Sequence, residues 1–301
     1  MIPGHSRPFS SPLKTQLTPT KIGNAIFFEH DNISRMLKLF WRGIALAGLI
    51  CFSVLFCLSA HAAPPAGYKL AWADEFNGPS LDTNKWVLWL LGRRHDAINT
   101  ADAIMLTNGC LVITTYTEGG TNFTGMVSTR GKFEPVRGYW EARIAFSETP
   151  GMWSAYWLQS PTMGRPPDDP AKAGMEIDII EHRATAKSGS REDGKVMHTL
   201  HWNGYGELHQ KNTHTTENSA LKSGFHIYGF EWTESAYRFY VDSKLTWTVN
   251  GPISKAPEFL ILSSEVKDKD WAGTIPRGGF GRRASSRTRM LVDYVRYYSK
   301  E

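Results

Sequence analysis

The chain has 301 residues, and its 34 lysines and arginines against 29 aspartates and glutamates give a formal net charge of +5. Aromatic residues make up 12% of the sequence, which excludes an intrinsically disordered chain because so many rings would bury a core. Three cysteines in this length exclude a disulfide scaffold. The positive charge would indicate a nucleic-acid or membrane-surface partner only if it lies on the folded part of the chain.

An uncharged apolar run spans residues 43–59, with Lys38 and Arg42 before it and the triplet Ala60-His61-Ala62 after it. A basic region, an apolar region and an A-x-A site in this order are typical of a secretory signal peptide, so we expect cleavage after Ala62. The alternative is a transmembrane anchor. The run is short for a span of ~20 residues, and no charge follows it closely to stop transfer.

Cleavage would divide the chain into a leader, residues 1–62, and one domain, residues 63–301, with Met36 as a candidate translation start. The leader carries six basic and two acidic residues, so the remaining domain has 28 basic and 27 acidic residues and a net charge of +1. Nucleic acid is therefore not an expected partner. Only Cys110 remains, which rules out an intrachain disulfide. We expect a secreted or periplasmic monomer without a stable membrane anchor.

Beyond the leader the sequence consists of short runs rich in β-branched and aromatic residues, several of which alternate with period two. Many short strands in one domain predict an all-β fold in which two antiparallel sheets pack as a sandwich or jelly roll. Asp242-Ser243-Lys244 is expected to form a hairpin turn. Residues 161–174 and 267–289 are expected to be long loops, and loops of such length are often functional. The expected strands are 110–117, 139–147, 225–234, 236–249, 259–266 and 290–299.

Three acidic residues, Glu176, Asp178 and Glu181, lie among isoleucines in a strand-like segment. Strands disfavour acids, and buried charges are costly unless they are paired. Glu176 and Asp178 are two residues apart and share a face of the strand. Glu181 reaches the same face only if one β-bulge lies between it and Asp178, in which case Ile177 and Ile179 point into the sandwich.

Three carboxyls on one face cannot all ionise freely, so at least one pKa is expected to be raised. A protonated acid beside an ionised carboxylate is what glycoside hydrolysis requires. The pattern alone leaves two alternatives open: an exposed edge strand with solvated acids, or a metal site. The alternating isoleucines argue against the first. Metal sites usually draw on histidines or on acids from several loops.

The segment Glu-Ile-Asp-Ile-Ile-Glu resembles the E-x-D-x-x-E active-site signature of glycoside hydrolase family 16. The resemblance continues in order through residues 68–299. It includes the opening Asp74-Glu75-Phe76-Asn77-Gly78, the tryptophan-bearing 151–158, His198-Thr-Leu-His201 and the closing 292–298. This family contains laminarinases, lichenases, agarases and κ-carrageenases. The bulged motif resembles that of laminarinases and many polysaccharide hydrolases, whereas bacterial lichenases have the shorter E-x-D-x-E.

The resemblance implies a β-jelly-roll of the concanavalin type and a retaining mechanism. It implies that Glu176 is the nucleophile, that Glu181 is the general acid and base, and that Asp178 tunes both. No cofactor is then required for catalysis. A structural calcium on the convex side, with Asp293 as a ligand, is a further expectation from the resemblance alone.

Aromatic faces suit the apolar C–H faces of sugar rings, so several residues are candidates for substrate binding. Trp153 and Trp157 match cleft tryptophans of the family and point the same way on a strand, although core packing is the alternative. His201 matches a histidine near the leaving group, and a structural role is equally compatible with the sequence. The further candidates are Trp202, Trp271 and Arg183.

These observations predict an exported endo-β-glycanase that acts on a β-1,3- or mixed β-1,3/1,4-glucan. The first alternative is hydrolysis of agar, carrageenan or another charged galactan. It is suggested by the basic loop with Arg282, Arg283, Arg287 and Arg289, because arginine forks suit sulfate. A transglycosylase would use the same residues. A non-catalytic lectin on the same fold is disfavoured, because a binding module has no use for a proton-sharing pair.

Overall fold

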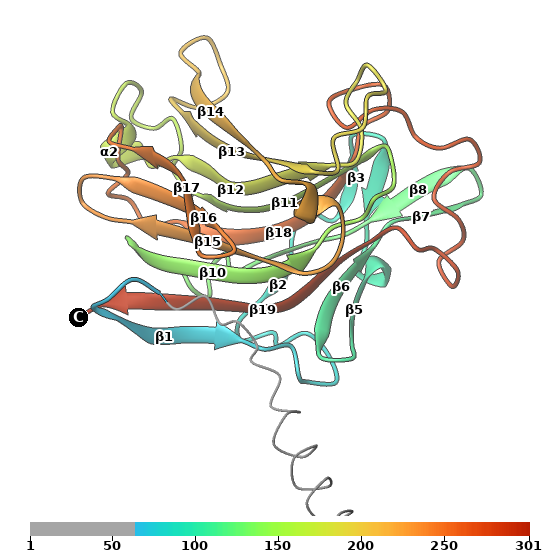
Figure 1. Ribbon diagram of the computed structural model, residues 1–301, viewed down its shortest axis with the longest axis horizontal. Coiled ribbons are helices and arrows are strands. Elements are labelled where there is room, and N and C mark those ends of the chain that lie inside the picture. The colour runs from blue at the N-terminus through green and yellow to red at the C-terminus, as the bar shows by residue number, and fades with distance from the viewer. Residues whose placement is uncertain (1–63) are drawn as a thin grey trace, which may run out of the picture. The chain divides into compact units, whose positions relative to one another are not determined.

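The computed structural model describes residues 64–301, so the predicted signal peptide and its cleavage site lie outside the described residues. The regular secondary structure of the described part is almost entirely strands, as the alternating sequence pattern predicts (Figure 1). In this part of the chain the longest helix, α2 (Pro170–Ala173), has four residues, and no helix is long and apolar enough to cross a membrane. Two short 3-10 helices span Ala101–Ala103 and Ser219–Lys222.

The first sheet has eight strands in the order β17-β16-β15-β10-β19-β6-β5, and β1 also pairs with β19. Its neighbouring strands are antiparallel. The strands are β1 (Tyr68–Asp74), β5 (Ile104–Thr107), β6 (Cys110–Thr114), β10 (Gly138–Ala145), β15 (His226–Trp232), β16 (Tyr237–Val241), β17 (Lys244–Val249) and β19 (Arg289–Lys300).

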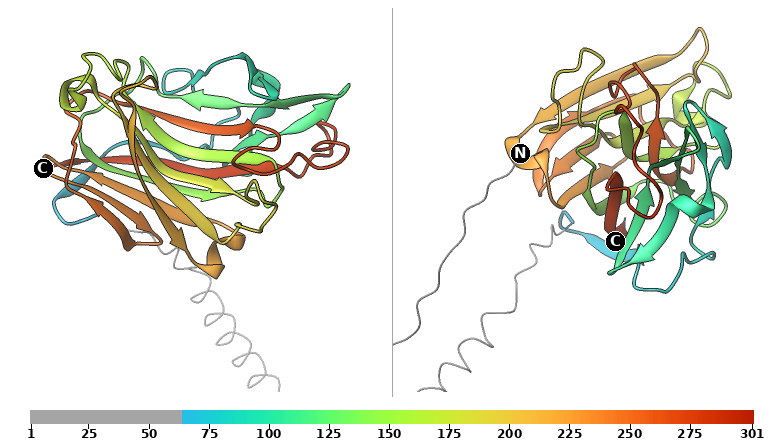
Figure 2. Two further views of the ribbon diagram at one scale, coloured as in Figure 1. Left: turned by 90° about the horizontal axis from the view of Figure 1, so that it is seen from above. Right: turned by 90° about the vertical axis from the view of Figure 1, so that its right-hand side faces the viewer.

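The second sheet has seven antiparallel strands in the order β14-β13-β12-β11-β18-β9-β2, and the three acids of the signature lie on β12 near its middle. Figure 2 shows its strands side by side in the view from above. The strands are β2 (Val87–Leu88), β9 (Met126–Ser128), β11 (Met152–Gln159), β12 (Glu176–Arg183), β13 (Lys195–Trp202), β14 (Gln210–Glu217) and β18 (Phe259–Val266).

A third, smaller sheet was not predicted from the sequence. It has the order β3-β4-β8-β7, and its β4–β8 pair is parallel. Its strands have three or four residues each, which is too short for a periodic pattern to show. They are β3 (Gly92–Arg94), β4 (Ala97–Asn99), β7 (Tyr116–Glu118) and β8 (Thr121–Thr124). The small sheet lies to the right in Figure 1, where the chain segment leading to β19 also passes.

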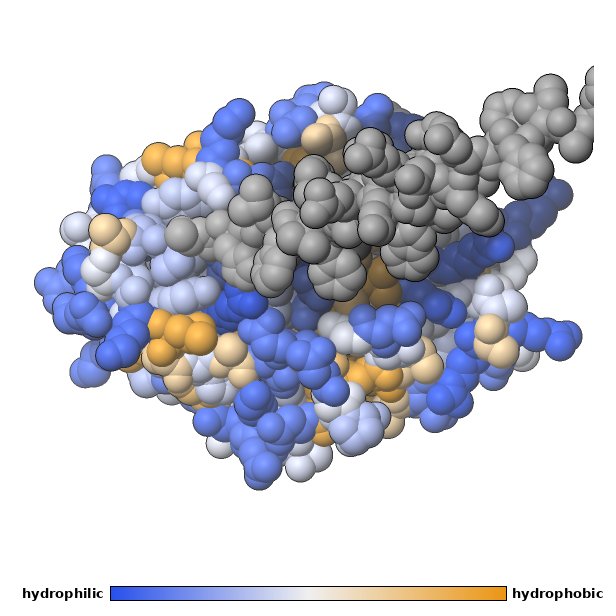
Figure 3. Space-filling model, turned by 60° about the horizontal axis from the view of Figure 1, so that its bottom comes forward, coloured by the Kyte–Doolittle hydropathy of each residue, from blue (hydrophilic) through white to orange (hydrophobic). Residues whose placement is uncertain are grey.

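The main core lies between the two large sheets and contains side chains from both, which confirms the predicted sandwich. Trp140 and Phe230 of the first sheet and Ile177 and Leu260 of the second are fully buried there. Burial of a large apolar side chain contributes ~1.5–3 kcal/mol, so this aromatic-rich layer is the principal source of stability. The lower side of the view of Figure 1 is mainly hydrophilic, with small separate hydrophobic patches, where the described residues form it (Figure 3).

Most of the predicted strands are present. The stretch 259–266 coincides with β18, and 236–249 forms the β16–β17 hairpin, in which Asp242 and Ser243 have φ of 49° and 66°. These left-handed conformations are those of the tight hairpin turns that match strand twist. The stretch 110–117 is not one strand, because the chain leaves the first sheet at Thr115 and continues as β7 of the small sheet.

Candidate active site

The three acids of the signature share one face of β12 because the strand contains a β-bulge, as predicted. Asp178 pairs with Thr199 of β13, and Glu181 pairs with Met197, so β12 has one residue more than its partner over this interval. The pairing with β11 shifts at the same place. The extra residue restores the alternation, and Glu176, Asp178 and Glu181 all line one pocket.

A buried histidine on β13 stabilises the bulge by a hydrogen bond to its backbone. The pairing with β11 skips Ile179, and the Nδ1 of His198 on β13 lies 2.7 Å from the Ile179 carbonyl oxygen, to which it donates. Burial lowers the pKa of His198 to about 4, so the ring is neutral and carries its one proton at Nδ1. Ile177, Ile179 and Ile180 are all buried in the core. The isoleucines therefore pack into the core between the sheets, while the three acids line the pocket on the outer face of the strand.

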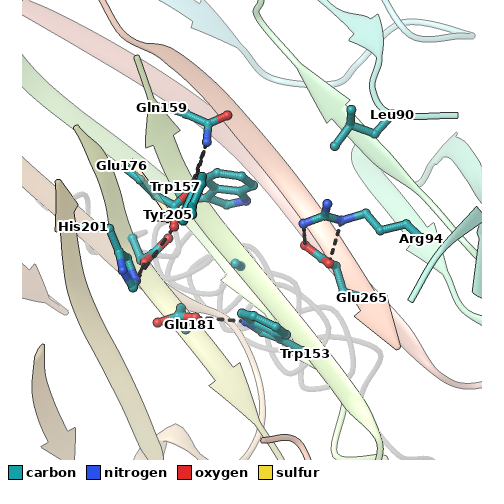
Figure 4. A pocket seen from close by; sticks show the side chains of 12 residues that line it. Leu90, Arg94, Trp153, Trp157, Gln159, Glu176, Glu181, His201, Tyr205 and Glu265 are labelled. Carbon is teal, nitrogen blue, oxygen red and sulfur yellow. Dashed lines mark hydrogen bonds and ion pairs between the residues drawn. The ribbon is translucent and has the colours of Figure 1, made fainter. Parts of the chain in front are cut away.

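Glu176 accepts hydrogen bonds from two side chains and lies near a third. The Nε2 of Gln159 donates to its Oε2 at 3.1 Å, and the hydroxyl of Tyr205 donates to the same oxygen. The Nε2 of His201 lies 3.8 Å from its Oε1 (Figure 4). Hydrogen bonds from neutral donors favour the charged form of a carboxyl.

Asp178 and Glu181 lie deeper. The Oδ2 of Asp178 is 3.4 Å from Nε2 of His201. Glu181 accepts a hydrogen bond from the indole Nε1 of Trp153 at 3.0 Å and another from the hydroxyl of Thr199 at 2.8 Å. Both carboxylate oxygens of Glu181 are therefore oriented by fixed donors.

Burial raises the pKa of all three carboxyls above their ordinary values. For Glu176 burial and the neighbouring Asp178 raise the pKa to about 8, against the opposing effect of Tyr205 and His201. The pKa of Asp178 is well above its ordinary value through burial and the charges of Glu181 and Glu265, and burial raises the pKa of Glu181 too. The site therefore retains protons near neutral pH. This property suits acid–base chemistry.

The pocket around these carboxyls has an aromatic wall on β11. Trp153 and Trp157 both line it, as their spacing predicts, and His201 lines it from β13 (Figure 4). The Nε1 of Trp157 donates to Ser263 at 3.1 Å, which fixes the plane of the indole. Whether these rings contact sugar stays a prediction, but their location on the acid-bearing face is as expected.

The other predicted binding residues lie outside this pocket. Arg183 is 4.4 Å from the ring of Trp271 and donates to its backbone oxygen at 2.7 Å, so it positions that tryptophan. Trp271 lies 5.3 Å from the ring of Trp153 and extends the aromatic surface away from the acids. Trp202 differs from expectation: the residue after His201 has its side chain on the opposite face, where it packs against the core.

Two expectations concern charged groups. Asp293 accepts a hydrogen bond from Arg143 at 2.7 Å, and calcium binding at Asp293 stays a prediction. The basic loop lies away from the acids. None of its four arginines lines the pocket, and Arg283 pairs with Asp102 at 3.2 Å.

One group within residues 64–301 has the spacing of a metal site. Ligand atoms of Glu176, Asp178 and His201 lie within 4.8 Å of one another. Gln159 and Tyr205 donate to Glu176, and the His201 ring lies 3.4 Å from Asp178, so these contacts explain the spacing without a metal.

Sequence reasoning missed several lining residues. Gln159 lies two residues after Trp157 on β11, so the strand alternation that puts Trp153 and Trp157 on one face predicts that Gln159 lies on that face too. Glu265 could not have been found, because only the fold brings it to the pocket, where Arg94 and His95 bind it at 2.7 and 3.2 Å. The list of missed residues is Leu90, Arg94, Ala155, Gln159, Tyr205 and Glu265.

Comparison with known proteins agrees with this geometry. The family model described as "Beta-porphyranase A-D, GH16 domain" matches residues 69–300. The chain is similar to the endo-1,3-1,4-β-glycanase ExsH of Rhizobium meliloti, at 27% identity over 77% of this chain and 47% of that protein. It is 27% identical to β-porphyranase B of Phocaeicola plebeius over 78% of this chain and 86% of that protein.

Among solved structures, the laminarinase catalytic domain of Thermotoga maritima is similar with a TM-score of 0.62 and 25% identity, over 78% of this chain and 99% of that one. The chain belongs to glycoside hydrolase family 16, and its sandwich is the jelly roll of those enzymes. It spans about half the length or less of the first curated relatives it matches.

Proposed function

We propose that this protein is a retaining endo-β-glycanase. The observation that carries the proposal is the bulged strand, which presents three carboxyls, two of them buried, on one face of an aromatic-walled pocket. A pair of carboxyls in which one is protonated and one is ionised is the equipment of glycoside hydrolysis. The membership of glycoside hydrolase family 16 supports the same conclusion.

In the proposed reaction Glu181, protonated, gives its proton to the leaving glycosidic oxygen. Glu176 attacks the anomeric carbon as the bond to that oxygen breaks, and a covalent glycosyl-enzyme forms. Glu181, now a carboxylate, removes a proton from water, which attacks the anomeric carbon and releases Glu176. The raised pKa of Glu181 suits its first role. Glu176 must be ionised to attack, and the hydrogen bonds that it accepts from Gln159 and Tyr205 favour this form against the burial that raises its pKa to about 8. Asp178, between them, shares protons with both.

The first candidate substrate is a β-1,3- or mixed β-1,3/1,4-glucan, which the similarity to ExsH and to the laminarinase domain supports. A charged galactan is the second candidate, and one observation favours it. Arg94 lines the pocket, and Glu265 binds only its Nε and Nη2. The remaining nitrogen, Nη1, is available to an anionic substituent. The match to the porphyranase family model agrees with this second candidate.

The test is to incubate residues 63–301 with laminarin, lichenan, agarose, porphyran and κ-carrageenan and to measure new reducing ends. We expect cleavage of at least one polymer and loss of cleavage in Glu176→Gln and Glu181→Gln. Arg94→Leu separates the two candidates, because it should impair a charged galactan far more than a neutral glucan. Binding of a polymer without cleavage would overturn the hydrolase proposal, and transfer to a sugar acceptor in place of water would show a transglycosylase.

We also infer that residues 1–62 direct export and that residues 63–301 work as a monomeric catalytic domain. The order of basic region, apolar run and A-x-A site supports export. The core that the two large sheets share within residues 64–301 supports a single domain after the leader. Amino-terminal sequencing of the exported protein tests the first inference, and sedimentation tests the second.

A further inference from the structure

The loop between β13 and β14, residues 203–209, brings a tyrosine to the proposed nucleophile. The Nε2 of Gln159 donates to the Tyr205 hydroxyl at 2.8 Å and to Oε2 of Glu176 at 3.1 Å. A phenol carries a single proton. Because the hydroxyl oxygen of Tyr205 accepts from Gln159, that proton is directed to Oε2 of Glu176, with which the structure records a hydrogen bond (Figure 4).

The position of Tyr205 is fixed by its loop. Asn203 donates to Asp168 in the neighbouring loop at 3.1 Å. Gly164 of that loop packs against Gly204 so closely that a Cβ on Gly164 would lie 2.7 Å from the Gly204 Cα. Tyr205 is 62% exposed, yet its hydroxyl reaches the partly buried carboxyl of Glu176. The loop backbone, rather than side-chain packing, therefore sets the place of the hydroxyl.

The arrangement distinguishes the two oxygens of Glu176. Oε2 accepts from both Tyr205 and Gln159, and Oε1 has only the ring of His201 at 3.8 Å. Oε1 is therefore the oxygen free to attack an anomeric carbon. Burial and the adjacent acids raise the pKa of Tyr205, so its hydroxyl keeps its proton at every working pH and remains a donor.

We propose that Tyr205 is a positioning residue of this site, whose hydroxyl favours the charged form of Glu176 and selects its Oε1 as the attacking oxygen. The inference rests on the proposed function of Glu176 as nucleophile. The same hydrogen bond acts again in the second step, when the bond from Oε1 to the sugar breaks and the carboxylate charge returns. Tyr205 thus contributes to both halves of the reaction.

The test is the pH dependence of kcat/KM in Tyr205→Phe, which keeps the ring and removes only the hydroxyl. A hydrogen bond to a charged group corresponds to a factor of roughly 10 to 100. We therefore expect the acid limb to move to higher pH by about one to two units. At pH values below the acid limb, the activity of Tyr205→Phe should be about 10- to 100-fold lower than that of the parent protein. This difference should shrink as the pH rises. Tyr68→Phe is the matched control, because the Tyr68 hydroxyl donates to a carboxyl, Glu231, at 3.0 Å on the other sheet.

A second measurement does not depend on turnover. Carboxyl carbon NMR of the free protein follows the titration of Glu176, whose signal is the one missing from Glu176→Gln. The titration should move to higher pH in Tyr205→Phe and stay in place in Tyr68→Phe. If the parent protein cleaves no glycan but this shift is seen, the proposed function fails and the role of Tyr205 in the ionisation of Glu176 stands.

Three results would overturn the inference about Tyr205 alone. The first is an unchanged Glu176 titration in Tyr205→Phe. The second is a loss of activity that is equal at every pH, which is the signature of a merely structural role. The third is a gain of activity, which would show that the hydroxyl obstructs the sugar site.

Discussion

Replacement of His198 by leucine tests how the β-bulge of β12 places the proposed acid/base. The Nδ1 of His198 donates to the carbonyl oxygen of Ile179 at 2.7 Å, and this is the residue that β11 skips in its pairing with β12. Leucine is similar in size but cannot donate. The carbonyl of the bulge would then remain buried without this donor, and the bulge would relax toward regular pairing.

The expected cost follows from these contacts. A buried acceptor that loses its partner costs ~1–3 kcal/mol. The Nε2 of His198 is also 3.1 Å from the hydroxyl of Thr246 and 3.3 Å from that of Thr216, but Thr246 keeps a hydrogen bond to Phe239. We therefore expect a decrease of about 3 kcal/mol in the free energy of unfolding. Small displacements of a catalytic group cost up to ~100-fold, so kcat should fall by roughly 10- to 100-fold through Glu181.

The assay is urea unfolding together with kcat measured well below the unfolding midpoint. His198→Asn is the matched control, because its amide nitrogen can donate from nearly the position of Nδ1, and it should recover most of the lost kcat. A variant His198→Leu that is destabilised but has normal kcat would show that the bulge places Glu181 without the histidine. Unchanged stability and unchanged kcat together would refute the reasoning.

Three further changes have defined outcomes. Glu258 is fully buried with a pKa raised to about 8 by that burial, so its stability contribution is lost as pH rises from its unfolded pKa near 4.5 toward 8. Chemical denaturation should show that Glu258→Gln gains about 3 kcal/mol relative to the parent between pH 5 and pH 8. Trp153→Phe removes the 3.0 Å hydrogen bond that lowers the pKa of Glu181. The alkaline limb of kcat/KM should therefore move to higher pH, and a downward shift would contradict this. Glu265→Gln weakens the pair with Arg94, and should raise KM several-fold with little change in kcat; an unchanged KM would show that the pair does not shape the sugar site.

The main architecture could be predicted because alternation is a local property of the chain. The β16–β17 hairpin shows this, since its strands alternate and Asp242-Ser243 forms the expected turn. The small sheet could not be predicted, because strands of three or four residues are too short to show a period. The segment 110–117 illustrates a different limit. Its residues are β-formers throughout, but the first part pairs with a strand of the first sheet and the second part with a strand of the small sheet. The sequence of a strand does not say which strand it pairs with.

The shared face of Glu176, Asp178 and Glu181 could be predicted, because a single bulge puts all three acids on one side of the strand and leaves the isoleucines in the core. The structure contains that bulge. Trp153 and Trp157 were named from the family resemblance, and strand parity predicted that they share a face, as they do in the pocket. Tyr205 and Glu265 could not be predicted, because they belong to other segments of the chain and only the fold brings their side chains close to the acids. The expectation that Asp293 binds calcium came from the family resemblance alone. Nothing in the sequence indicated that Asp293 pairs with Arg143.

Azide rescue of two alanine variants tests the assigned roles of Glu176 and Glu181 most directly. With an activated aryl β-glycoside, Glu181→Ala should form the glycosyl-enzyme and then react with azide to give a β-glycosyl azide. Glu176→Ala should give the α-glycosyl azide by direct displacement. Proton NMR of the two products distinguishes these configurations. The opposite pair of products, or rescue of neither variant from a protein whose parent is active, would contradict the account of this site.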